Sequence, residues 1–103
     1  MRAEEIFQFG EYRVDPQDRT LRRNDMPVGL NRRAFDVLLY LVRNPGRVVT
    51  RSMILDKVWG MRIQPDTNVV DVHIYRLRGK VDVDGRQPLI RTLRGVGYVL
   101  RDR

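Results

Sequence analysis

The chain of 103 residues contains no cysteine and only one histidine. The absence of cysteine excludes disulfide bonds, zinc sites with thiolate ligands and a thiol nucleophile, and it is compatible with a cytoplasmic location. His73 has no cysteine or second histidine with which to share a metal ion. We therefore expect no metal site.

Long apolar runs are also absent. No stretch approaches the roughly 18 apolar residues of a membrane-spanning helix, and Glu4 and Glu5 precede any apolar stretch, which argues against a secretory signal. The content of hydrophobic (42%) and charged (32%) residues is typical of a soluble globular domain. We expect one domain over residues 1–103.

The residue sets of an enzyme are missing as well. The sequence shows no nucleophile–base pair, no phosphate-binding loop and no set of metal ligands. Asp82 and Asp84 could be interpreted as paired carboxylates, but a solvated turn is the simpler interpretation. We predict that the protein is not an enzyme and needs no cofactor.

Basic charge is concentrated in one part of the chain. The net charge is +7 and the pI about 10.7. Residues 1–42 contain seven basic and seven acidic groups, whereas residues 43–103 contain thirteen basic and six acidic groups. Such an excess is typical of a nucleic-acid-binding surface, although a basic surface also promotes solubility alone.

Short strands with turn signals between them fill residues 6–29. Turn-forming residues follow at Pro16 and at Asn24, and Pro27 restricts the last strand to an edge or a strand end. The pattern predicts a four-stranded antiparallel sheet that packs one face on helices.

Three helices and a hairpin are expected next. Asn31 is a good N-cap for a helix over residues 32–43, and Gly60 ends a second helix over residues 51–59. A possible strand at residues 48–49 separates them. A third helix covers residues 67–82, capped by Asp66 or Thr67. Two strands, at residues 89–93 and 98–101, form a hairpin (wing residues 89–101) whose turn is residues 94–97, with Gly95 and Gly97. The inward positions of the first two helices are Phe35, Leu38, Leu39, Val42, Ile54, Leu55 and Val58.

The third helix has two contrasting faces. Val70, Ile74, Leu77 and Val81 fall on one stripe at helical spacing and predict a core-facing side. The opposite side mixes an amide, a guanidinium, a phenol and a small apolar group, which suits base edges in a DNA major groove. Two helices followed by a basic hairpin make a winged helix-turn-helix plan, with Arg94 at the hairpin tip beside the minor groove.

The segments TNVVDVHIYRLRGKVD and LIRTLRGVGYVL closely resemble the effector domain of OmpR/PhoB-type response regulators. RSMILDKVW resembles the preceding helix of that family, and the resemblance covers nearly the whole chain. It implies an α+β winged helix-turn-helix that binds specific double-stranded DNA as the output domain of a two-component phosphorelay in bacteria. The sequences of the helix and the loop are most similar to those of the heavy-metal-responsive subgroup.

The resemblance also implies roles for individual side chains. The residues of the third helix expected to contact bases are Asn68, Val69, Asp71, Val72, Tyr75 and Arg76. The residues expected to contact phosphates are Arg51, Trp59, His73, Arg78 and Thr92, and we add the basic residues Lys80 and Arg91. The wing places Arg94 in the minor groove. A loop that touches RNA polymerase in some relatives corresponds to Met61, Arg62, Ile63, Gln64, Pro65 and Asp66.

Several of these positions allow a second interpretation. Val72 either contacts a thymine methyl group or is an ordinary exposed valine, and Arg76 binds either a base or a phosphate. Asp71 either accepts from a cytosine or pairs with a neighbouring arginine. Trp59 is expected mostly in the core, with its indole N–H at the rim. Tyr75 stands where several relatives have arginine, which predicts a different DNA preference.

The family also suggests partners. We expect a monomer in isolation and a head-to-tail dimer on direct-repeat half-sites, with possible contact to RNA polymerase. A sensor kinase acts through a receiver domain that these 103 residues do not include, so the chain resembles an excised effector domain. The alternative from another class is a winged helix that docks only proteins.

Overall fold

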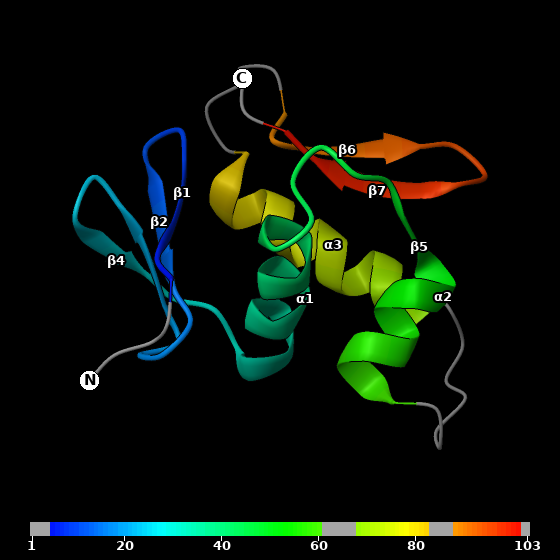
Figure 1. Cartoon of the computed structure of the whole chain (residues 1–103), viewed down its shortest axis with the longest axis horizontal. Coiled ribbons are helices and arrows are strands. Elements are labelled where there is room, and N and C mark those ends of the chain that lie inside the picture. The colour runs from blue at the N-terminus through cyan, green and yellow to red at the C-terminus, as the bar shows by residue number, and fades with distance from the viewer. Residues whose placement is uncertain (1–4, 61–67, 83–87, 102–103) are drawn as a thin grey trace.

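A computed structural model of the chain describes residues 5–60, 68–82 and 88–101 (Figure 1). Its architecture is the predicted winged helix-turn-helix, with a sheet, then helices, then a hairpin. In chain order the elements are β1 (Phe7–Phe9), β2 (Tyr12–Asp15), β3 (Thr20–Arg23), β4 (Met26–Val28), α1 (Arg32–Val42), β5 (Val49–Thr50), α2 (Arg51–Ile54), η1 (Leu55–Trp59), α3 (Asn68–Val81), β6 (Ile90–Leu93) and β7 (Gly97–Leu100).

The first four strands form the predicted antiparallel sheet in the order β1-β2-β3-β4. Its register aligns Phe7, Val14, Leu21 and Val28 in one apolar row across the four strands. Pro27 lies in the edge strand β4, where its missing N–H interrupts no inner ladder. The sheet lies beside α1, on the side away from α2 (Figure 1).

Helix α1 is the centre of the core. The side chain of Asn31 accepts a hydrogen bond from the Ala34 N–H at 2.8 Å, which confirms the predicted cap. Leu39, predicted to face inward, is only half-buried, whereas Val37 and Leu41 are fully buried. The reason is that α1 contacts α3, η1 and β7, so more than one stripe of the helix is covered.

The second helix occupies the predicted residues, but it changes geometry halfway. Thr50 caps α2 by accepting from the Met53 N–H at 3.1 Å. The chain then widens into the π-helical turn η1, closed by the Gly60 N–H on the Leu55 carbonyl at 3.0 Å. Gly60 has a φ of 85°, which favours glycine and ends the helix.

Helix α3 buries the predicted stripe, with Val70, Ile74, Leu77 and Val81 each exposed by at most 1%. The proposed caps at Asp66 and Thr67 lie outside the described residues. At the other end, the buried Tyr12 hydroxyl donates to the Val81 carbonyl at 3.0 Å. The N-terminal sheet therefore supports the end of α3 directly.

The second sheet has the order β5-β7-β6, so its central strand is last in the chain. Residues Val49 and Thr50 pair with β7, one position later than the predicted strand at residues 48–49. Gly97 was predicted to belong to the hairpin turn, but it lies in β7. A Cβ atom there would stand 2.0 Å from the Val49 carbonyl oxygen, so this glycine permits close strand approach. Gly95, with a φ of 73°, is the residue that the turn itself needs.

None of the helices in the described residues has the length and apolar character needed to cross a membrane.

Candidate nucleic-acid interface

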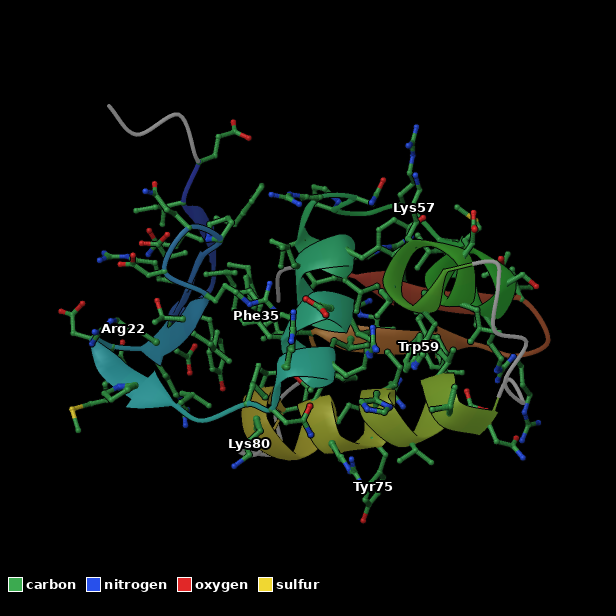
Figure 2. The ribbon with its side chains drawn as sticks, turned by 90° about the horizontal axis from the view of Figure 1, so that it is seen from below. Arg22, Phe35, Lys57, Trp59, Tyr75 and Lys80 are labelled. Atoms are coloured by element: carbon green, nitrogen blue, oxygen red, sulfur yellow. The ribbon has the colours of Figure 1, made fainter. Side chains whose placement is uncertain are left out.

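The outer face of α3 presents large side chains to solvent. Tyr75 is 79% exposed and Val72 is 45% exposed, and Asn68 and Arg76 are exposed beside them. Figure 2 shows Tyr75 pointing away from the molecule, on the side opposite Lys57. Because the buried stripe anchors the other side of α3, this face is free to enter a groove of the DNA.

Val69 differs from the other predicted base-reading residues. It is half-buried and packs against the hydrophobic core. Only part of its side chain therefore lies on the outer face of α3.

Asp71 is engaged within the protein. Its Oδ1 atom accepts from Arg51 Nε at 2.8 Å and from the Tyr98 hydroxyl. The pairing with a neighbouring arginine, one of the two interpretations of the sequence, is thus observed. Burial raises the pKa of Asp71, but the hydrogen bonds from Tyr98 and Arg51 and the charge of Arg51 outweigh it, so the pKa is lowered.

Tyr98 joins the wing to both helices of the motif. Its side chain is buried in β7, and guanidinium groups lie near its ring from α2 (Arg51, 5.5 Å) and from α3 (Arg78, 5.7 Å). Burial and the hydrogen bond to Asp71 raise the pKa of Tyr98. The role of Tyr98 could not be predicted from the sequence, since nothing in the spacing of a strand tyrosine reveals a distant carboxylate.

Arg78 connects α3 to the wing from the other side. Its Nε donates to the Ile90 carbonyl at 3.1 Å, and its Nη2 donates to the Thr92 hydroxyl. Both Arg78 and Thr92 were predicted to hold phosphates. The structure brings them together, so any phosphate bound here meets two side chains already fixed by each other.

Trp59 and His73 meet at the contact of η1 with α3. Their rings pack edge to face with centroids 5.2 Å apart, and the Arg33 guanidinium lies 5.1 Å from the Trp59 ring centroid. His73 Nδ1 lies 2.8 Å from the Val69 carbonyl oxygen, and a carbonyl can only accept. A phosphate bond from His73 Nε2 would therefore require the doubly protonated ring. Arg33 is a further basic residue at this contact, and its position was not predicted from the sequence.

The remaining predicted contacts lie at the two ends of the surface. Arg94 is exposed at the tip of the wing, while Arg91 is half-buried and donates from Nε to the Pro88 carbonyl at 3.2 Å. Lys80 is exposed near the end of α3 and points away from the molecule (Figure 2). Lys80 and Arg76, four residues apart on α3, line the same groove.

The segments on either side of α3 include two further predicted features. The polymerase-contact loop, residues 61–66, lies outside the described residues. Asp82, predicted in a solvated turn, instead accepts from the backbone N–H groups of Leu89 (2.7 Å) and Ile90 (3.3 Å). The carboxylate of Asp82 is therefore not simply solvated, because it is hydrogen-bonded to the backbone at the start of the wing.

Comparison with known proteins agrees with this geometry. The response regulator MprA of Mycolicibacterium vanbaalenii is 44% identical over 94 residues, covering 91% of this chain and 41% of MprA. The chain thus spans about two fifths of the length of that relative. The OmpR/PhoB homologue DrrB of Thermotoga maritima gives a TM-score of 0.84 at 32% identity, covering 93% of this chain and 44% of DrrB.

A DNA complex is known for a similar domain. The RstA DNA-binding domain of Klebsiella pneumoniae, solved with the RstA box, gives a TM-score of 0.83 at 30% identity. The match covers 94% of this chain and 97% of that domain. A family model described as "Transcriptional regulatory protein, C terminal" matches residues 25–100. The chain therefore belongs to the OmpR/PhoB-type effector domains, a family of DNA-binding transcription regulators and not of enzymes.

Proposed function

We propose that this chain is the output domain of a bacterial two-component response regulator and reads operator DNA with α3 in the major groove. The observation that carries the proposal is the outer face of α3. Its exposed Val72, Tyr75 and Arg76 offer methyl, aromatic and guanidinium groups to base edges, while the inner face is fully anchored. Arg94, exposed on the wing tip, reaches the adjacent minor groove.

The basic side chains around this face supply affinity that does not depend on sequence. Lys80 lies near the C-terminal end of α3 and Arg91 on β6, while Arg51 and Arg78 contact groups between α3 and the wing. Neutralising phosphates releases counterions, so binding should weaken steeply as salt rises. The similar RstA domain was solved in complex with the RstA box, which supports DNA as the partner of this domain.

The proposed oligomeric state and protein partners are based on the family and not on contacts in the structure. We propose that the chain is a monomer alone and a head-to-tail dimer on direct-repeat half-sites, and that residues 61–66 contact RNA polymerase. We further propose a cytoplasmic location and control by a sensor kinase through a receiver domain, as befits a relative of a response regulator.

Selection of bound duplexes from a random DNA pool tests the central proposal. The expected result is enrichment of a defined motif, with a binding constant that falls as salt rises. If no duplex shifts in an electrophoretic assay even at low salt, the domain docks only proteins, and the DNA-reading role of α3 is wrong.

Arg76→Ala tests base reading on the selected motif. Removal of the guanidinium should relax preference at one base position and weaken binding by about 1–3 kcal/mol. Lys80→Ala is the matched control, because a phosphate contact should weaken binding to all duplexes alike. Unchanged discrimination by Arg76→Ala would remove Arg76 from the base-reading set.

A further inference from the structure

We infer that Asp71 is a positioning residue that fixes the orientation of the recognition helix relative to the wing, and that it does not read a base. The inference rests on the proposed DNA-binding function. It concerns the polar joint of four side chains, Asp71 and Arg78 from α3, Arg51 from α2 and Tyr98 from β7.

The joint ties together the elements that would touch DNA. Asp71 Oδ1 accepts from Arg51 Nε at 2.8 Å and from the Tyr98 hydroxyl, so one oxygen holds both α2 and the wing. Arg78 adds a second tie through the Ile90 carbonyl at 3.1 Å. The contacts of Asp71 and Arg78 with the wing lie at different positions along α3. Rotation of the wing about the helix would therefore break at least one charge-assisted hydrogen bond.

Tyr98 is held firmly within the wing sheet. Its ring is buried, with 4% exposed, and its strand pairs on one side with Val49 and on the other with Thr92. A buried hydroxyl without a partner is unfavourable, and Asp71 supplies that partner. The position of Tyr98 is therefore set by β7, and the hydrogen bond forms only when α3 is oriented so that Asp71 reaches the Tyr98 hydroxyl.

This geometry competes with base reading by the same carboxylate. A cytosine amino group would have to bond Asp71 while Arg51 and Tyr98 already fix the orientation of the carboxylate. The Asp71 side chain is 38% exposed, but its charge is paired with the Arg51 guanidinium, which weakens its attraction for a cytosine amino group. Orientation of the groove-facing parts is then the contribution that Asp71 makes to DNA binding.

Positioning and a simple charge effect predict changes of opposite sign in affinity, whereas base reading is distinguished from positioning by relaxed preference at one base pair. Asp71 carries a negative charge near the DNA phosphates, so a residue acting by charge alone would tighten binding when neutralised. A positioning residue would weaken binding when its hydrogen bonds are lost, because DNA would then have to order the wing. D71A and D71N remove the same charge, but only D71N keeps an oxygen that can accept from Tyr98.

The experiment measures binding of D71A, D71N, Y98F and D71A/Y98F to duplexes that the wild-type chain selects from a random pool. Each variant is also tested on duplexes with every base pair of the motif replaced in turn. Circular dichroism melting reports folding. We expect D71A to bind about tenfold more weakly, with the ranking of the substituted duplexes preserved.

D71N should recover part of the lost affinity. Y98F should resemble D71A, and the double variant should be no weaker than D71A alone, because both changes break the same joint. Should D71A fail to fold, Y98F keeps the buried ring and carries the same test.

Two results would overturn the inference while leaving the proposed function intact. One is tighter or equal binding by D71A, and the other is relaxed preference of D71A at one base pair. If the wild-type chain enriches no duplex, the proposed function fails and the inference falls with it. The wild-type selection therefore distinguishes the two failures.

Discussion

The two sheets of this domain are both small and antiparallel, but they are built and connected differently. The sheet β1-β2-β3-β4 comes from one continuous run between Phe7 and Val28. The sheet β5-β7-β6 pairs Val49–Thr50 with β7, which begins 47 residues after Thr50, at Gly97. The first lies beside the central helix, whereas the second carries the projecting hairpin (Figure 1).

Their links to α3 differ as well. The N-terminal sheet reaches the end of α3 through apolar packing and the Tyr12 hydroxyl on Val81. The wing sheet is joined to α3 by charged groups, Asp71 with Tyr98 and Arg78 with Ile90. Changes in the first sheet should therefore affect stability alone, while changes at the wing should affect stability and DNA recognition together.

The largest effect is expected from Gly97→Ala, which attacks the wing sheet. The new Cβ would stand 2.0 Å from the Val49 carbonyl oxygen, so β5 and β7 must separate. We expect a loss of about 3 kcal/mol in the free energy of unfolding by denaturant, together with weaker DNA binding. Gly79→Ala is the control, because nothing lies within 4 Å of that Cβ and helix propensity favours alanine. Equal stability of the two variants would contradict the close approach.

Asp82→Ala should have the next largest effect. The change leaves the Leu89 and Ile90 N–H groups without the carboxylate at the start of the wing. We expect a destabilisation of about 2 kcal/mol in denaturant unfolding, since hydrogen bonds to a charged group are strong. Asp56→Ala removes an exposed carboxylate from η1 and should leave stability nearly unchanged. A similar loss in both variants would point to net charge instead.

Tyr12→Phe probes the N-terminal sheet. The ring stays stacked on Phe9, but the hydrogen bond to the Val81 carbonyl is lost. We expect a loss of about 1 kcal/mol in thermal or denaturant unfolding, with DNA preference unaltered. Tyr75→Phe removes the same hydroxyl from an exposed site and should leave stability unchanged. Altered base preference in Tyr12→Phe would break the separation between the two sheets.

The smallest effect concerns acid pH. The pKa of Asp71 is lower in the folded chain than in the unfolded chain, where it is about 3.9. Its stabilising contribution is therefore present above that value and is lost as the pH falls through the folded pKa. We expect the stability of D71N to depend less on pH below about 4 than that of the wild type. Parallel curves from thermal melts would show that the joint adds no pH-dependent stability.

Local patterns made much of the fold predictable. The helical spacing from Val70 to Val81 defined the buried stripe of α3, and the Asn31 cap was evident from its amide side chain before an apolar run. The four N-terminal strands were also predictable, because strands adjacent in sequence pair through short turns. Each of these signals depends on residues only a few positions apart.

Contacts between distant segments were not predictable in this way. Asp71 meets Tyr98 and Gly97 meets Val49 only after segments far apart in the chain have folded together. Asp82 and Leu89 are only seven residues apart, but nothing in their spacing predicts that the carboxylate accepts from the backbone. Aspartate and glycine suit turns in general, so local reasoning placed Asp82 in a solvated turn and Gly97 at a hairpin tip. The tertiary structure gave both residues other partners.

By itself the sequence determined which side of α3 would be buried and which would carry Tyr75, Val72 and Arg76, because helical periodicity assigns faces without reference to the rest of the chain. Only the tertiary structure decided how that face is held relative to the wing. The reason is physical: orientation is set by hydrogen bonds and close approach between segments far apart in the chain, and these depend on where the folded backbone places each donor and acceptor.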